Sequence, residues 1–238
     1  MSATLAERFD LGDHELVAFV GAGGKSTLLL RLGAELVHSG SRVILTTTTK
    51  LGLDQVTGTV CYSSDPAEVE ACFASPGPVF VVSTEDGRKV TGPSPEEVDR
   101  LFAETTSDYI LVEADGARGR SIKAPDVHEP VVPTTATLVV LVASLNAIGL
   151  PLAEAAHRPE LVSALSGLDL TAPVGPEHVA ALLAHPEGGL KGVPDQARVV
   201  VALTGGTPGG REEAAGLICR RLELVPLIGE IALIPPFE

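Results

Sequence analysis

A glycine-rich turn between two apolar segments, residues 17–30 (VAFVGAGGKSTLLL), constrains this chain more than any other feature. The apolar residues 17–20 predict a buried strand, and the leucines that follow Lys25 predict a helix. Glycines between such elements adopt positive φ and let backbone N–H groups approach phosphate oxygens without a Cβ atom in the way. The order strand, glycine loop, Lys-Ser-Thr, helix is typical of a phosphate-binding loop.

The residues of this loop have separate expected tasks. The backbone of the glycine segment and the unpaired N–H groups of the helix N-terminus would hold phosphate oxygens. Lys25 supplies a positive charge for the outer phosphates, and Ser26 supplies a hydroxyl for Mg²⁺. The predicted nucleotide-binding set is Gly21, Ala22, Gly23, Gly24, Lys25, Ser26 and Thr27.

The loop departs from the common pattern G-x-x-x-x-G-K-[ST], which would place a glycine where this chain has Phe19. It has the shorter form G-x-x-G-K-S-T. Glycine turns also precede helices in α/β proteins that bind no phosphate. Because Lys25, Ser26 and Thr27 follow the glycines directly, the sequence favours a phosphate site.

Composition excludes several classes of protein. The 238 residues are 45% hydrophobic, which indicates a folded chain, and the net charge of −14 disfavours nucleic acid and anionic membranes as partners. No apolar run approaches the roughly 18 residues that a membrane span needs, and the N-terminus has no apolar core of a signal peptide. The three cysteines form no C-x-x-C pair, so we expect buried free thiols and a cytoplasmic protein.

The pattern of segments predicts one α/β domain over residues 1–238. A helix at 25–39 between strands at 17–20 and 42–45 is a βαβ unit, which implies a parallel sheet. We therefore expect a three-layer, Rossmann-like fold of the P-loop type, with helices on both faces of the sheet and a helical elaboration at 145–195. Further predictions are a hairpin that pairs 79–83 with 88–91, and closing strands at 225–228 and 232–234.

Two carboxylates follow a continuous apolar segment at 109–112, which predicts a central strand of a parallel sheet. Glu113 and Asp115 are two residues apart, so on an extended chain they share one face. Mg²⁺ prefers oxygen ligands, and we predict that Ser26 together with Glu113 or Asp115 organises this ion. Surface capping or ion pairing is the alternative for both acids.

Cations form the third part of the predicted site. Arg118 and Lys123 lie close behind the two carboxylates and could neutralise phosphate charge or hold a second anionic substrate. Lys50 follows a run of four threonines at the carboxyl end of a predicted strand. Open α/β sheets bind ligands at this end of their strands. Solvated basic loops are the alternative. The predicted catalytic set is Lys25, Asp115, Glu113, Arg118, Lys123 and Lys50.

Three blocks in this order resemble the selenium-dependent hydroxylase accessory proteins of the YqeC type: GAGGKST at 21–27, TTTTK at 46–50 and EADGARGRSIKAP at 113–125. The blocks HEP at 128–130, HRPE at 157–160 and HPEGGLKG at 185–192 extend this resemblance. It implies a nucleoside-triphosphate-binding protein with Mg²⁺ that assists a molybdenum hydroxylase apo-enzyme. The segment 204–208 lacks an Asn-Lys-x-Asp motif, so ATP and GTP both stay open.

Three hypotheses follow from these observations. The preferred one is a Mg²⁺-dependent NTPase. A nucleotide-gated binding or chaperone protein with negligible turnover is the second, because the helical elaboration could present a partner surface. A small-molecule kinase or ligase is the third, since the short loop also resembles that of the Mur-type amide ligases.

Overall fold

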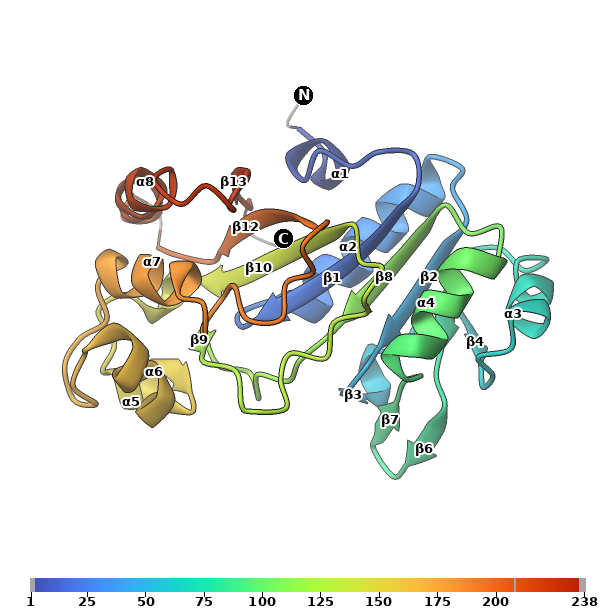
Figure 1. Ribbon diagram of the computed structural model, residues 1–238, viewed down its shortest axis with the longest axis horizontal. Helices are drawn as coiled ribbons and strands as arrows, with labels where there is room; N and C mark the ends of the chain where they lie inside the picture. Colours follow the sequence, from blue (N-terminus) through green and yellow to red (C-terminus); the bar gives the residue numbers. More distant parts are fainter. Residues whose placement is uncertain (1–2, 208, 236–238) are drawn as a thin grey trace.

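An eight-stranded sheet forms the centre of the computed structural model, which describes residues 3–207 and 209–235 (Figure 1). Its strands follow the spatial order β13-β12-β10-β1-β8-β2-β5-β4, and each neighbouring pair is parallel. The strands are β1 (Glu15–Gly21), β2 (Val43–Thr47), β4 (Thr59–Cys61), β5 (Val79–Val81), β8 (Tyr109–Glu113), β10 (Leu138–Ser144), β12 (Arg198–Thr204) and β13 (Glu230–Leu233). The predicted α/β class with a mainly parallel sheet is confirmed.

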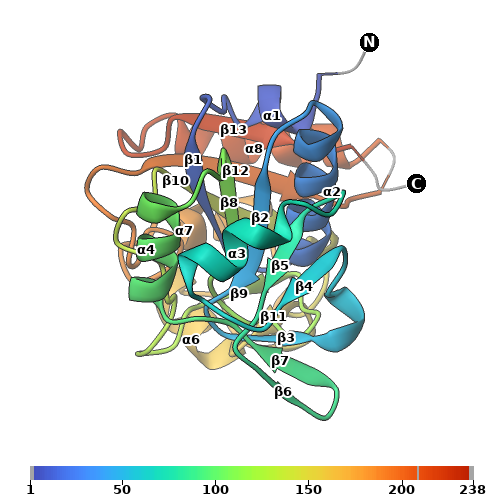
Figure 2. The same ribbon diagram turned by 90° about the vertical axis from the view of Figure 1, so that its right-hand side faces the viewer.

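Helices cover both faces of this sheet (Figure 2). They are α1 (Leu5–Arg8), α2 (Lys25–His38), α3 (Pro66–Cys72), α4 (Pro95–Glu104), α5 (Leu152–Ala155), α6 (Pro159–Ser166), α7 (Pro176–Ala184) and α8 (Arg211–Leu222). Side chains alternate along β1, so that Val17 and Phe19 pack with α1 and α2 in one hydrophobic layer. Leu16, Ala18 and Val20 face the other layer, which holds α3, α4, α7 and α8. Burial on both faces explains the nearly continuous apolar strands.

Local signals in the sequence explain where several helices begin. Asp65 accepts hydrogen bonds from the Ala67 and Glu68 N–H groups before α3, and Pro66 occupies the first helical position. Ser94 forms a reciprocal capping box with Glu97 at the start of α4. These caps satisfy N–H groups that have no partner within the helix.

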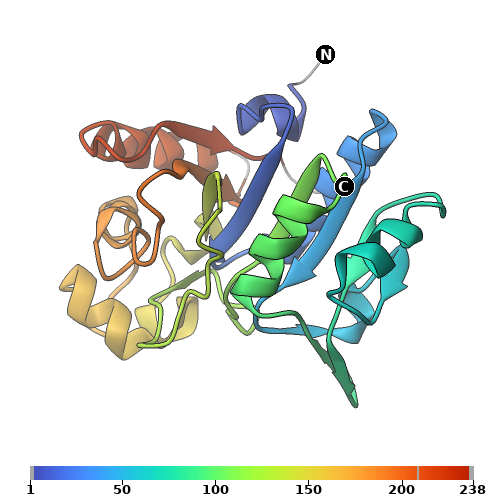
Figure 3. The ribbon, with the colours of Figure 1, turned by 45° about the vertical axis from the view of Figure 1, so that its right-hand side comes forward.

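Two small sheets lie beyond the carboxyl ends of the central strands. One contains β3 (Lys50–Gly52), β7 (Lys89–Thr91) and β6 (Thr84–Asp86), all antiparallel, and the other pairs β9 (Ile122–Lys123) with β11 (Ala156–His157) in parallel. Figure 3 shows the β6–β7 hairpin and the helices α5 and α6 on opposite sides of this edge of the molecule. The short helices η1 (Leu53–Gln55) and η2 (Leu145–Ala147) complete the fold.

Three sequence predictions need correction. The hairpin pairs β6 with β7, whereas β5 belongs to the central sheet, because Val79–Val81 is fully buried and Thr84–Asp86 is exposed. No strand forms at 225–228, where the N–H groups of Val225 and Ile228 donate into turns after α8. All three cysteines are free thiols as predicted, but only Cys61 is buried.

No helix among the described residues is long and apolar enough to cross a membrane.

Candidate functional site

The glycine loop connects β1 to α2 and packs against the end of β10. Gly21, Gly23 and Gly24 have φ of 94°, 87° and 122°, which is backbone that other residues rarely adopt. A Cβ atom on Gly21 would collide with the Val142 carbonyl, and one on Gly23 would collide with Ser144. The Ala22 N–H donates to the Val142 oxygen at 2.9 Å. Both the dihedral angles and the contact with β10 therefore require glycine.

The first turn of α2 presents a lysine and a hydroxyl beside this loop. Gly24 caps the helix without a side chain, which leaves the first N–H groups open to a ligand. Lys25 is buried, and its Nζ donates to the Gly21 carbonyl at 2.7 Å. Ser26 Oγ donates to Oε2 of Glu113 at 2.6 Å. Thr27 is exposed and lines the cleft described below.

The two carboxylates at the end of β8 make different contacts, which the sequence left open. Glu113 ends the strand beside Ser26, and its Oε1 lies 3.9 Å from Lys25 Nζ. Asp115 points toward the loop itself, because its Oδ2 accepts the Gly21 N–H at 3.0 Å and its Oδ1 lies 3.2 Å from Lys25 Nζ. Asp115 therefore fixes the loop and its lysine, whereas Glu113 lies beside the hydroxyl.

A hard divalent cation fits the donor atoms of this corner. The Ser26 hydroxyl and the Glu113 carboxylate are oxygen donors in mutual contact, and Mg²⁺ accepts one or two such protein ligands with waters and phosphates as the rest. Burial raises the pKa of Glu113 above its ordinary value, although Lys25 and Ser26 oppose this effect. A bound cation would favour the charged form of the same carboxylate.

A chain of ion pairs extends from Asp115 away from the phosphate loop. Lys123 Nζ lies 3.0 Å from Asp115 Oδ2 and 2.6 Å from Glu129 Oε2. Arg158 reaches both oxygens of Glu129, at 2.7 and 3.2 Å, and contacts Asp126 at 3.3 Å. Burial opposes the charge of Glu129, but hydrogen bonds from Arg158 and Lys123 lower its pKa to about 2.

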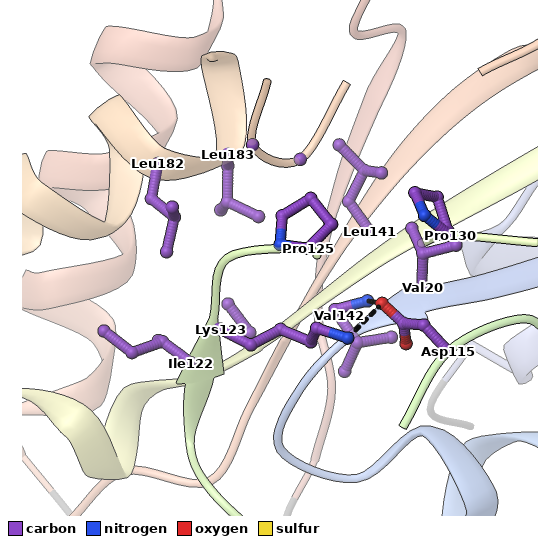
Figure 4. A pocket seen from close by; sticks show the side chains of 14 residues that line it. Val20, Asp115, Ile122, Lys123, Pro125, Pro130, Leu141, Val142, Leu182 and Leu183 are labelled. Atoms are coloured by element: carbon purple, nitrogen blue, oxygen red, sulfur yellow. Dashed lines mark hydrogen bonds and ion pairs between the residues drawn. The ribbon is translucent and has the colours of Figure 1, made fainter. Parts of the chain in front are cut away.

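Apolar side chains shield the inner end of this chain (Figure 4). A cavity of about 20 Å³ adjoins Asp115 and Lys123, roofed by Pro125, Leu182 and Leu183. A volume of this size admits about one water molecule. The Lys123 side chain is 1% exposed, so it cannot contact a ligand in the open cleft.

An open cleft of about 810 Å³ spans the carboxyl edge of the sheet next to the phosphate loop. Lys50, exposed on β3, and Arg118, exposed with φ of 49°, both line it. On the β10 and β12 side, the cleft is lined by Ser144, Asn146, Thr204 and Gly205. Most of the predicted site residues therefore line this cleft. The ones that do not line it are Gly21, Ala22, Asp115 and Lys123.

The threonine run that precedes Lys50 has a structural task. Thr46 Oγ1 donates to the Val81 carbonyl and Thr47 Oγ1 to the Glu113 carbonyl, both at 2.8 Å. Thr48 Oγ1 donates to Val131 at 2.6 Å. These hydroxyls join β2 to the neighbouring segments and so fix the position of Glu113.

Sequence reasoning missed several residues of the site. Glu129 and Arg158 lie in the blocks quoted at 128–130 and 157–160, but their pairing was missed because they are 29 positions apart in the chain. Lys89 also lines the cleft, from a hairpin whose register was predicted wrongly. Ser144 and Thr204 could have been found, because each ends a parallel strand at the edge where α/β sheets bind ligands. Among the described residues, no group of three His, Cys, Asp or Glu side chains could hold a metal ion.

Comparisons with known proteins agree with the blocks quoted above. Residues 17–160 match the family model described as YqeC protein. The chain is 36% identical over 197 residues to a protein of Escherichia coli (strain K12) named "Uncharacterized protein YqeC", and the aligned part covers 80% of this chain and 77% of that protein. The matched segment 17–160 contains the phosphate loop, both carboxylates and the ion-pair chain to Arg158.

Proposed function

The chain belongs to the YqeC family, and we propose that it is a Mg²⁺-dependent nucleoside-triphosphate-binding protein that hydrolyses its nucleotide. One observation supports this most: a glycine loop that continues into the open N-terminus of α2, with Lys25, Ser26 and Glu113 clustered at the same point. This combination offers backbone N–H groups, a positive charge and hard oxygen ligands within one corner.

The residues of this corner have separate roles in the proposal. The N–H groups of the loop and the first turn of α2 bind phosphate oxygens, and Lys25 adds charge for the outer phosphates. Ser26 and Glu113 hold Mg²⁺, which supplies charge neutralisation for the leaving phosphates. Asp115 keeps the loop and Lys25 in position through contacts with the Gly21 N–H and Lys25 Nζ. ATP and GTP are both candidates.

The partner in this proposal is the apo form of a molybdenum hydroxylase, whose maturation the protein assists. This part rests on the resemblance of the quoted blocks to selenium-dependent hydroxylase accessory proteins. A kinase or ligase activity is the second candidate, favoured by the exposed cations Lys50 and Arg118 beside the loop.

The Mg²⁺ assignment is tested with Ser26→Ala. Thermal unfolding is followed with ATP or GTP, with and without Mg²⁺, because stabilisation rises with ligand concentration over Kd. We expect Mg²⁺-dependent stabilisation of the unaltered protein by at least one nucleotide, and loss of the Mg²⁺ dependence in Ser26→Ala. Ser163→Ala, the same hydroxyl deletion on α6, should keep it. Equal stabilisation of both variants would contradict the assignment.

Turnover is tested by phosphate release, with and without the hydroxylase partner. Repeated release of phosphate by the protein alone supports an NTPase. Binding without release in either condition would contradict hydrolysis and leave a nucleotide-gated chaperone as the better description.

A further inference from the structure

The cleft beside the phosphate loop concentrates positive charge in a strongly acidic protein. The chain has 31 Asp and Glu against 17 Lys and Arg, yet among the described residues only Glu113 and Glu129 line the cleft with a carboxylate. The cations that line it are Lys25, Lys50, Lys89, Arg118, Arg120 and Arg158. A positively charged cleft in a chain of negative net charge attracts anionic ligands selectively.

Two of these cations lie diagonally across neighbouring strands on one face of the small sheet. In the register of β3 and β7, Lys50 is opposite Thr91 and Lys89 is opposite Gly52, so both lysines share one face. Leu51 and Val90 occupy the other face as a buried pair. The packing of that apolar pair therefore directs Lys50 and Lys89 away from the core, and both line the cleft.

Within residues 3–207 and 209–235, neither lysine has a carboxylate partner. Among the described residues, no Asp or Glu oxygen lies within 4.0 Å of the Nζ of Lys50 or Lys89, or of the Arg118 guanidinium. The two lysines therefore share one face without a counter-charge, which leaves their positive charges available to an anionic ligand.

Arg118 is a third cation that lines the cleft without a carboxylate partner among the described residues. Arg118 and Gly119 are consecutive residues with positive φ, of 49° and 72°, in the exposed loop that follows Asp115 in the chain. A non-glycine residue in this region is strained and persists where the surroundings require it. His157 also lines the cleft. Burial lowers the pKa of His157 most, and the positive charges of Arg158, Lys123 and Arg118 lower it further.

The remaining cations are already engaged. Arg158 is paired with Glu129 and Asp126, and Arg120 donates to the Glu154 carbonyl. Lys123, which the sequence suggested as an anion ligand, is buried between Asp115 and Glu129. Lys25 is held by Asp115, Glu113 and the Gly21 carbonyl. This leaves Lys50, Lys89 and Arg118 as the cleft cations without a carboxylate partner among the described residues.

We propose that Lys50, Lys89 and Arg118 form a second anion site, which binds a small molecule with at least two phosphate or carboxylate groups next to the nucleotide. The site deepens the proposed function, because such a ligand would be the co-substrate or effector of the same cleft. Arg118 can bind a phosphate or carboxylate in bidentate geometry, and the two lysines add point charges.

The test is calorimetric titration of inorganic pyrophosphate in metal-free buffer at fixed ionic strength. It is done on Lys25→Ala, in which the phosphate loop lacks its lysine, and on the same variant with Lys50→Glu and Lys89→Glu. We expect the two added reversals to weaken pyrophosphate binding about tenfold or more. Citrate is titrated in parallel: binding of either anion with this charge dependence supports the site, and the tighter of the two identifies its chemistry.

The matched control adds Arg88→Glu and Arg221→Glu, which change the net charge equally at exposed residues that do not line the cleft. The control should bind pyrophosphate as Lys25→Ala does. Equal affinity in all three proteins, or equal loss in the control and the test variant, would overturn the proposal.

Two further measurements make the test of this anion site independent of the nucleotide site and of the folding of Lys25→Ala. Binding of Mg²⁺ with ATP or GTP to the unaltered protein reports on the phosphate loop, so a failed nucleotide site with a pyrophosphate site intact contradicts only the proposed function. Where Lys25→Ala does not fold, the His157 resonances are followed in otherwise unaltered protein. Pyrophosphate should shift them in the Arg88→Glu, Arg221→Glu control but not in Lys50→Glu, Lys89→Glu, and equal shifts in both would overturn the site.

Discussion

Glu129 connects the ion pairs behind the phosphate loop to the helical segment that begins with α6. Removal of its charge should therefore lower the free energy of unfolding. Its carboxylate contacts Lys123 at 2.6 Å and both guanidinium nitrogens of Arg158, which precedes that helix. These contacts lower the pKa of Glu129 from 4.5 to about 2. The perturbation of choice is Glu129→Gln, which keeps the shape and removes the charge.

The magnitude follows from the pKa. At about 1.4 kcal/mol per unit, the shift corresponds to about 3.5 kcal/mol of stability. Because the Glu129 side chain is 17% exposed, solvent screening reduces this to about 2–3 kcal/mol. In a chain of this length such a loss lowers Tm by roughly 4–12 °C.

The sign of the pH dependence is equally defined. A carboxylate with a lowered pKa stabilises the fold fully above its unfolded pKa and loses this effect as pH falls through the folded one. The difference in unfolding free energy between the unaltered protein and Glu129→Gln should therefore be constant at neutral pH. It should shrink between about pH 4.5 and pH 2, the two pKa values of Glu129.

Urea unfolding across this pH range measures the difference directly. Glu187→Gln, which removes an exposed carboxylate without a side-chain partner among the described residues, is the control and should change stability by less than about 0.5 kcal/mol. A Glu129→Gln effect as small as that of the control, or one independent of pH down to pH 2, would refute the reasoning.

Three further outcomes are expected. Gly23→Ala should abolish stabilisation by nucleotide in thermal unfolding, since its Cβ would overlap Ser144 and its φ of 87° disfavours alanine; retained stabilisation would contradict the loop geometry. Asp115→Asn should weaken nucleotide binding about tenfold, because a buried carboxylate that holds Lys25 and the Gly21 N–H loses its charge; calorimetry with Thr171→Ala as a surface control measures this. The His157 pKa, read by NMR, should lie below 6.5 and rise when pyrophosphate binds in the cleft; an ordinary value unaffected by pyrophosphate would argue against the nearby cations.

Local patterns in the sequence were sufficient for much of the fold. The glycine loop, the apolar β1 and the cap residues Asp65 and Ser94 act on their immediate neighbours, so their structural consequences could be predicted. The prediction of the hairpin was wrong because the choice between β5 and β6 as the partner of β7 depends on burial in the central sheet. That information lies in the tertiary fold.

The candidate site was predictable as a set of residues but not as an arrangement. Glu113 and Asp115 were equivalent in sequence, and only the position of α2 puts one beside Ser26 and the other beside the Gly21 N–H. Lys123 looked like a ligand-binding cation, but β9 and β11 bury it. Such distinctions arise from contacts between segments distant in the chain.

The central claim is that Lys25 at the start of α2 binds the phosphates of a nucleotide. The most direct measurement is calorimetric titration of ATP and of GTP with Mg²⁺ into the unaltered protein, Lys25→Ala and Lys191→Ala. Lys191 is the matched control, because it is the lysine that neither lines the cleft nor contacts Asp115. We predict that Lys25→Ala weakens binding at least about tenfold and that Lys191→Ala leaves it unchanged. Unchanged nucleotide affinity in a folded Lys25→Ala variant would contradict the account.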